Sequence, residues 1–220
     1  MATETLEETI TVRGEAVVPG EPDEAHLFVR LSSTRPTPHE ALENVAVRSQ
    51  ALDLLFGELQ IPPPDLATSG LSVREKREWM NRGSIHRGYE AYVTIIVRLD
   101  EPGLIGRLTH GAVERAEAHV EGPVWRVALE NPARAEACRQ AARDARRKAE
   151  AYAEALGIRL GPIASISETT PRTDFSQRWL DRETFSAEMA SGASLPELEV
   201  QPGTLDVTAK VAVTFRIEQG

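Results

Sequence analysis

Hydrophobic residues recur at helical spacing in three segments of the chain. Residues 38–59 follow a suitable cap at Thr37 and carry apolar positions three and four apart. Residues 104–116 repeat this pattern over a shorter length. The longest such segment, residues 131–157, is dominated by alanine, the residue with the highest helix propensity. The spacing therefore predicts three helices, of which the last is long and alanine-rich.

Both ends of this long helix carry the residue types that helix ends prefer. Asn131 suits the N-cap, Pro132 suits the first helical position, and Gly157 suits the left-handed residue that follows a helix. We predict a packing face of mostly small side chains, which lets the helix lie close to a sheet. The sole cysteine belongs to this face and is expected to be a buried thiol. The predicted face consists of Cys138, Ala142, Ala145, Ala149, Tyr152 and Leu156.

The remaining apolar segments alternate with polar residues at the period of a strand. The turn residues 19–22 separate the first two segments, which are therefore predicted to pair as a hairpin. The mixture of strands and helices predicts an α+β fold, in which a largely antiparallel sheet with two-strand hairpins packs against the three helices. We expect a single domain over residues 1–220, in one body or two lobes. The predicted strands are residues 9–18, 25–31, 66–77, 89–99, 120–129, 160–169 and 205–217.

Residues 171–202 form an irregular excursion that is too long for an ordinary connection. Within it, residues 176–190 could make one amphipathic helix. A lid, a partner-binding arm and a variable surface segment are alternatives that the sequence leaves open. The candidate interaction residues of this excursion are Trp179, Leu180, Phe185 and Met189.

The segment 74–88, REKREWMNRGSIHRG, lies between two predicted strands and admits two interpretations. Its arginines and lysine beside Trp79 could hold a phosphate backbone and stack a base. Alternatively, it is a long hairpin arm on which Trp79 and Met80 pack against a partner subunit or the sheet. We favour the arm, with Trp79 and Met80 as candidate interaction residues, because two glutamates lie among the cations.

Charge and composition narrow the function classes. The net charge of −9 argues against a nucleic-acid partner, since nucleic-acid binders carry basic surfaces. The apolar run 91–97 is far too short to cross a bilayer, so no membrane span is predicted. The first residues show neither the basic nor the apolar region of a signal peptide, and we therefore expect a cytoplasmic protein.

No motif for a chemical reaction stands out along the chain. The five histidines lack the spacing of a zinc site, and the nucleophile elbow, the phosphate-binding loop and the dinucleotide fingerprint are absent from the sequence. His110 and Glu114 lie one helical turn apart, a spacing typical of a surface contact. The sequence thus predicts no catalytic, cofactor-binding or metal-binding residues, and no cofactor.

Several stretches together resemble the SIMPL-domain family, from about residue 10 to residue 215. The helix motif in residues 141–161 is the most specific of them. The resemblance implies an α+β fold, frequent export to the periplasm or cell surface, an association with oxidative-stress defence and a tendency to self-assemble. The stretches are ITVRGEAVV with PDEA, TSGLSV, GYEAYVTIIV, ARDARRKAEAYAEALGIRLGPIASISE and PGTLDVTAKVAVTF.

These observations lead to two hypotheses of different class. The first is a non-enzymatic SIMPL-domain protein that forms a homo-oligomer or docks a protein partner. The second is a small-ligand-binding protein or enzyme, with a pocket under the excursion at residues 171–202. The missing reaction motifs and the two apolar segments favour the first.

Overall fold

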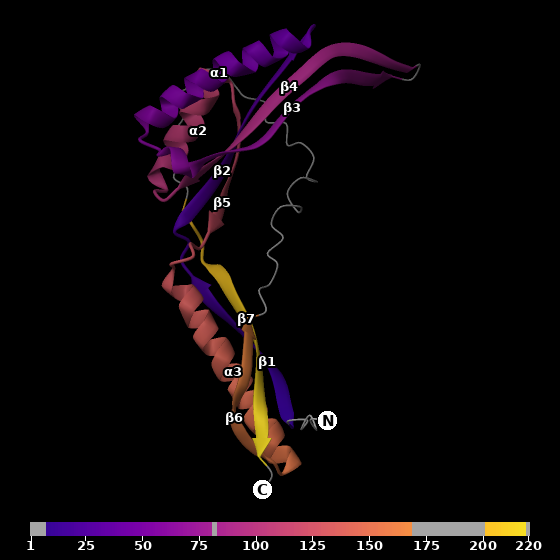
Figure 1. The fold of residues 1–220 in the computed structure, drawn as a ribbon. Helices are drawn as coiled ribbons and strands as arrows, with labels where there is room; N and C mark the ends of the chain where they lie inside the picture. The colour runs from indigo at the N-terminus through magenta and orange to yellow at the C-terminus, as the bar shows by residue number, and fades with distance from the viewer. Residues whose placement is uncertain (1–7, 81–82, 169–200, 219–220) are drawn as a thin grey trace, which may run out of the picture. The chain divides into compact units, whose positions relative to one another are not determined.

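The computed structural model describes residues 8–80, 83–168 and 201–218, and their contacts divide the elements into two compact units (Figure 1). The three-stranded unit contains β1 (Thr9–Gly20), α3 (Pro132–Leu156), β6 (Arg159–Glu168) and β7 (Leu205–Glu218). The four-stranded unit contains β2 (Glu24–Arg35), α1 (Pro38–Glu58), a 3-10 turn (Pro63–Asp65), β3 (Leu66–Met80), β4 (Gly83–Leu99), α2 (Gly103–Ala116) and β5 (His119–Arg126).

The predicted fold class is confirmed, because every strand pairing is antiparallel and the helices pack on sheets. The strands form two sheets, ordered β1-β7-β6 and β3-β4-β2-β5. The predicted hairpin of the first two strands is wrong, since β1 pairs with β7 and β2 pairs with β4 and β5. The prolines and glycine after β1 specify a change of direction, but they do not specify which strand becomes the partner.

The predicted ends of α3 are confirmed. The Asn131 side chain accepts a hydrogen bond from the Ala133 N–H at 2.9 Å, and Pro132 opens the helix. Gly157 follows the last helical residue with φ of +67°, the left-handed conformation that glycine adopts without steric cost. Local residue choice alone therefore delimits this helix.

The packing face of α3 differs from the predicted one. Cys138, Ala142, Tyr152 and Leu156 are exposed, so the expectation of a buried thiol is wrong. The prediction mixed steps of three and four, which keeps a face parallel to the helix axis. The real contact uses steps of four only and winds about 40° around the axis per step, as expected against a twisted sheet. The buried residues are Ala137, Ala141, Ala145, Ala149 and Ala153.

Close approach explains why these residues are small. A methyl group at Gly14 of β1 would meet the Ala145 nitrogen at 2.6 Å and the Ala145 Cβ at 2.8 Å, besides the carbonyl oxygen of Ala141. Backbone therefore lies almost directly on backbone at this point. The larger side chains Val12, Val213 and Phe215 fill the core of the three-stranded unit around the contact.

Polar bonds hold α3 against the edge strand β1. The Asp144 carboxylate accepts from the Glu15 N–H at 3.1 Å, and the Lys148 ammonium donates to the Arg13 carbonyl at 3.0 Å. The two side chains also pair with each other at 2.6 Å. Lys148 and the Glu15 N–H lower the pKa of Asp144, because both stabilise its ionised form.

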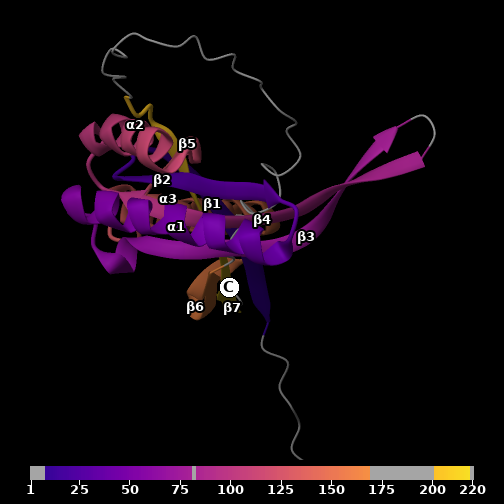
Figure 2. The same cartoon turned by 90° about the horizontal axis from the view of Figure 1, so that it is seen from above.

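In the four-stranded unit, α1 and α2 pack over one face of the sheet (Figure 2). Alternate residues of β2 and β4 point into this core, as the period-two pattern predicts. The N-cap Thr37 of α1 is confirmed by its hydrogen bond from the Glu40 N–H at 3.3 Å. The largest fully buried side chains are Leu27, Val29, Leu31, Leu52, Val97 and Leu108.

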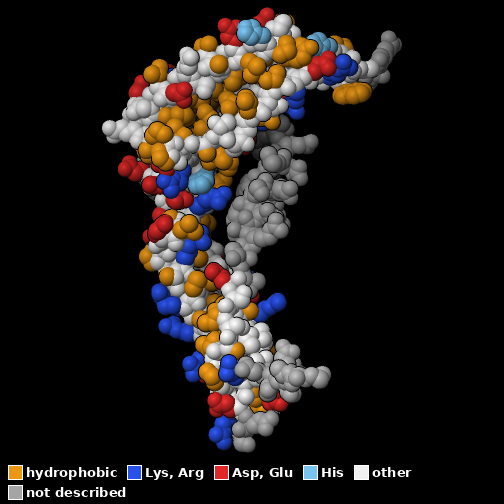
Figure 3. Space-filling view, in the orientation of Figure 1, with side chains coloured by type: hydrophobic (Ala, Val, Ile, Leu, Met, Phe, Trp, Pro, Cys, Tyr) orange, Lys and Arg blue, Asp and Glu red, His pale blue; other side chains and the backbone are white. Residues whose placement is uncertain are grey.

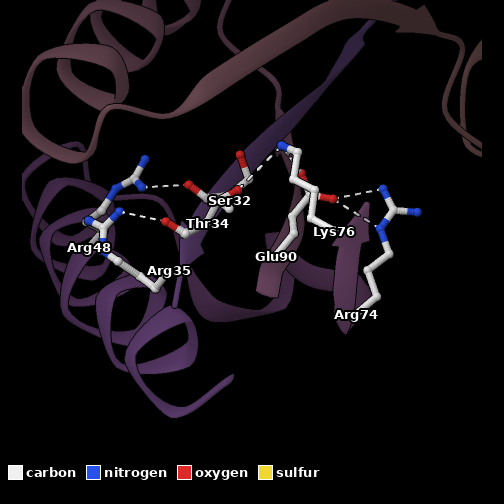
Figure 4. A network of polar contacts seen from close by, with 7 residues as sticks. All are labelled: Ser32, Thr34, Arg35, Arg48, Arg74, Lys76 and Glu90. Carbon is white, nitrogen blue, oxygen red and sulfur yellow. Dashed lines mark hydrogen bonds and ion pairs between the residues drawn. The ribbon is translucent and has the colours of Figure 1, made fainter. Parts of the chain in front are cut away.

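Arg48 of α1 connects three elements of this unit. Its guanidinium donates to the carbonyls of Ala116 at 2.8 Å, Glu117 at 2.7 Å and Ser32 at 2.8 Å. Ala116 and Glu117 form the C-terminal end of α2, where carbonyls lack helical partners and a cation is favourable. Figure 4 shows Arg48 directed toward Ser32 on β2.

We predict that Gly14→Ala destabilises the protein by about 1–3 kcal/mol, because the added methyl forces α3 away from β1. Urea unfolding measures this change. Gly57→Ala is the matched control: it adds the same methyl in α1, where nothing lies within 4 Å of the new atom. Equal stability of the Gly14 variant and the parent would contradict the close contact.

We predict that Arg48→Met, which keeps the length of the stem, costs about 2–3 kcal/mol through loss of charged hydrogen bonds to three carbonyls. Arg48→Lys should recover part of this loss. Arg115→Met serves as the control, because Arg115 makes one exposed pair with Glu58 and should cost less than about 1 kcal/mol. Similar thermal unfolding of the two methionine variants would disprove the role of Arg48.

Candidate interaction arm

The β3–β4 hairpin extends beyond the rest of its sheet. The last pair between β2 and β4 is Arg35 with Tyr89, and β4 residues before Tyr89 pair with β3 alone. We call residues 75–80 and 83–89 the arm. Both views show it reaching past α1 and α2 (Figures 1 and 2). The sequence-based interpretation of a long hairpin arm is therefore confirmed.

Large apolar side chains lie uncovered on the arm and at its base. Trp79 is 83% exposed and Leu71 is 68% exposed, while Ile85 and Val73 are 46% and 38% exposed. Leu71, Val73 and Trp79 lie on one face of the hairpin, and Glu75 and Arg77 occupy the positions of that face between Val73 and Trp79. Figure 3 shows hydrophobic side chains beside charged ones along this part of the molecule.

The opposite face of the hairpin carries ion pairs. Glu90 of β4 lies 2.8 Å from the Arg74 guanidinium and 3.2 Å from the Lys76 ammonium, which also donates to Thr34 at 3.4 Å (Figure 4). The hydrogen bond from Arg74, and then that from Lys76, lowers the pKa of Glu90 against the opposing effect of burial. These bonds fasten the base of the arm to β2 and β4.

Further pairs lie toward the tip, and those of Glu75 are on the face that also carries Trp79. Glu75 lies 3.0 Å from Arg77 and 2.8 Å from His86, and both contacts lower the pKa of Glu75, the one with Arg77 more strongly. Arg87 pairs with Glu78 at 2.5 Å. The described cations in segment 74–88 thus have carboxylate partners within the same hairpin, which leaves less charge for a phosphate backbone. Arg82 lies outside the described residues.

The predicted interaction residues are only partly accounted for. Trp79 lies near the end of β3 with its side chain in solvent, and Met80 is the last residue of that strand. Trp179, Leu180, Phe185 and Met189 belong to the excursion and lie outside the described residues. The role of both groups in an interaction therefore stays a prediction.

Sequence reasoning missed Leu71, Val73 and Ile85. Their alternation identified strands, and alternating apolar residues normally face a core. For Ile85, the pattern could not show that β2 ends before the hairpin does; for Leu71 and Val73, it could not show that β3 is the edge strand of its sheet. The one available signal was the run of charges in residues 74–78, which indicates a segment without a core beneath it.

A second polar cluster lies near the start of β2. Arg98 bonds to Asp65, with Nε at 2.8 Å, and to Glu24 at 3.3 Å. His26 lies 3.5 Å from Glu24; burial, followed by the nearby charge of Arg126, lowers the pKa of the imidazole. The carboxylates of Asp65 and Glu24 are both paired with the Arg98 guanidinium. We therefore interpret this cluster as a structural network.

Other candidate chemistry is sparse in the described part of the chain. Residues 8–80, 83–168 and 201–218 contain no group of three or more His, Cys, Asp or Glu arranged to hold a metal ion. His110 and Glu114 lie 3.3 Å apart with both side chains mostly exposed, which confirms the expected surface contact. Among the described helices, none has the length and apolarity needed to traverse a lipid bilayer.

One shallow hollow of about 410 Å³ lies between α3 and β6 in the three-stranded unit. Its lining includes the apolar Leu160, Ile163 and Phe215 and the charged Arg146 and Glu150. These two charges pair with each other at 2.8 Å. The hollow therefore offers apolar surface but few polar groups free to orient a ligand.

Two antiparallel sheets with packed helices and a projecting hairpin define an α+β protein with an exposed arm. Its sequence matches the model of the SIMPL family, a protein family of unknown function (DUF541), over residues 10–215. Because the match covers most of the chain, the protein belongs to the SIMPL family, as the resemblance predicted. A search of curated proteins finds no match to it.

We predict that Glu90→Gln destabilises the protein by about 1 kcal/mol at neutral pH, because the ion pairs with Arg74 and Lys76 are lost. The pKa of Glu90 is lowered by folding, so its stabilisation is present at neutral pH and is lost as the pH falls through the folded-state pKa. The difference in thermal unfolding between parent and variant should therefore shrink toward about pH 3. Glu114→Gln, in an exposed pair, is the control and should change little at either pH.

Proposed function

We propose that this SIMPL-family protein is non-enzymatic and that it acts by self-assembly, or by docking a protein partner, through the β3–β4 arm. The observation that carries the proposal is the side chain of Trp79, which is 83% exposed on the arm, with Leu71 and Val73 exposed at the base of the hairpin. Tryptophan is enriched at binding hot spots, so an exposed tryptophan on a projecting hairpin supports an interaction role.

The arm is rigid enough to present Trp79. Its two strands pair from Glu75 with Tyr89 to Met80 with Gly83, with one bulge on β4, and cross-strand ion pairs of Glu75, Glu78 and Glu90 hold its base and shaft. A tryptophan brings a large contact area at small entropic cost and is enriched at binding hot spots. Trp79 is therefore the residue we expect to contribute most to binding.

The physiological setting is proposed on the resemblance alone. An association with oxidative-stress defence fits a protein that assembles and does not turn over a substrate. We also propose a cytoplasmic location.

The alternative is a small-ligand-binding protein or enzyme with a pocket under residues 171–202. Those residues lie outside the described structure. The hollow between α3 and β6 gives this alternative limited support, since its rim charges already pair with each other. Binding of a small molecule by the arm-deleted variant described below, with no loss of affinity, would favour it.

Arm deletion tests the proposal. Residues 76–88 are replaced by Asn-Gly, which closes Glu75 and Tyr89 into a tight hairpin. Light scattering coupled to size exclusion should give a mass above 24.1 kDa for the parent chain and the mass of one chain for the variant. A variant lacking residues 176–190 tests the second candidate segment in the same way.

Circular dichroism and thermal unfolding of the variants provide the control for folding. The arm contributes no residue to either hydrophobic core. The arm-deleted variant should therefore keep the circular dichroism spectrum and the thermal unfolding transition of the parent. A parent protein that stays monomeric at high concentration would rule out self-assembly. Association that survives both deletions would rule out both candidate segments.

A further inference from the structure

Strand β3 is an edge strand along its whole length. In the sheet order β3-β4-β2-β5 it pairs with β4 only, and the described residues place no strand on its other side. The extra residue of the bulge near Lys76 lies on β4, so β3 continues from Gly70 to Met80 without interruption. An edge of this length with free backbone N–H and C=O groups is a template for a further strand.

The order of residues along this edge is self-complementary. Residues 73–79 read Val-Arg-Glu-Lys-Arg-Glu-Trp. Laid antiparallel on its own copy with Lys76 at the centre, the segment puts each Arg74 opposite the partner's Glu78 and each Glu75 opposite the partner's Arg77. Opposite charges on directly facing residues stabilise antiparallel strands.

The apolar ends of the segment match in the same register. Val73 lies opposite the partner's Trp79, and this pair occurs twice because of the two-fold symmetry. Aromatic and β-branched side chains form favourable cross-strand pairs. The pairing would thus cover the 83% exposed side chain of Trp79 and the exposed side chain of Val73.

Only one like-charged pair arises, at the two-fold axis, where Lys76 faces its own copy. Each Lys76 ammonium lies 3.2 Å from Glu90 of its own chain, which reduces their mutual repulsion. The neighbouring registers are worse. A shift of two residues brings Glu75 opposite its own copy in one direction and Arg77 opposite its own copy in the other. The charges therefore select a single register.

We propose that two copies of this protein associate by antiparallel pairing of their β3 strands about Lys76, which joins the two sheets edge to edge. This inference rests on the proposed function and specifies its partner, its interface strand and its register. Edge charges ordinarily discourage pairing with strands of unrelated sequence. Here the order of signs makes a second copy of the same chain the complementary partner.

Complementary charge reversal tests the interface. The variant Glu75→Arg with Glu78→Arg makes the edge wholly basic, and Arg74→Glu with Arg77→Glu makes it mainly acidic. Each alone should repel its own copy and give the 24.1 kDa mass of one chain in light scattering. An equimolar mixture should restore a particle of twice that mass, because each basic edge now faces an acidic one.

Two controls accompany the mixing experiment. Arg143→Glu with Arg146→Glu removes the same number of cations at exposed positions of α3, and it should leave association unchanged. Thermal unfolding of each variant checks that the fold is retained. Failure of the mixture to associate, with both variants folded, would overturn the proposed pairing.

Disulfide trapping tests the register. In a Cys138→Ser background, Lys76→Cys places two thiols directly opposite each other at the axis and should give a covalent dimer on mild oxidation. Val73→Cys is the matched control, since the register sets it about 20 Å from its own copy. Equal trapping at both positions, or trapping at Val73 alone, would overturn the register.

The outcomes separate this inference from the proposed function. A monomeric parent overturns the β3 pairing and the self-assembly form of the proposed function, and it leaves docking of a different protein partner as the remaining form. A parent that associates through the arm, while both charge variants still self-associate and Lys76→Cys does not cross-link, leaves assembly in place and disproves β3 pairing.

Discussion

The β3–β4 arm, which carries the candidate function, exists because neighbouring strands of its sheet differ in length. β4 spans 17 residues and β2 spans 12, so the ladder between them ends at Tyr89 while the β3–β4 ladder continues. A strand that has no neighbouring strand on one side and no helix over its face must contact solvent or another molecule. The exposure of Trp79 follows directly from this mismatch, whereas Leu71 and Val73 are exposed on the edge strand opposite β4 residues that still pair with β2.

A different constraint shapes the three-stranded unit. Three strands and a single helix have little volume for a core, so the helix must lie very close to the sheet to exclude water. Glycine at position 14 and alanines at every fourth position of α3 make this possible. Asp144 and Lys148 bond to the backbone of β1. These bonds use the N–H of Glu15 and the carbonyl of Arg13 on that edge strand. The two edge strands β1 and β3 thus differ: helix side chains bond to the backbone of the first, whereas among the described strands only β4 pairs with the second.

Polar networks complete the packing where apolar contacts end. Arg48 satisfies carbonyls at the C-terminal end of α2 and on β2, and Glu90 gathers Arg74 and Lys76 at the base of the arm. Such bonds hold the arm in a defined direction relative to its own sheet. The same charges give the free edge of β3 its order of signs, so one set of residues stabilises the hairpin and defines what could pair with it.

The sequence by itself determined the elements of this protein. Caps at Thr37, Asn131 and Gly157 and the apolar periods defined the helices and strands, because these depend on residues close together in the chain. Tertiary structure alone decided which strands pair and which apolar residues stay exposed. β1 joined β7 across most of the chain, the face of α3 rotated away from Cys138, and Leu71 and Val73 lost the cover that their pattern predicted. Each of these outcomes depends on where distant segments end, and local patterns carry no record of that.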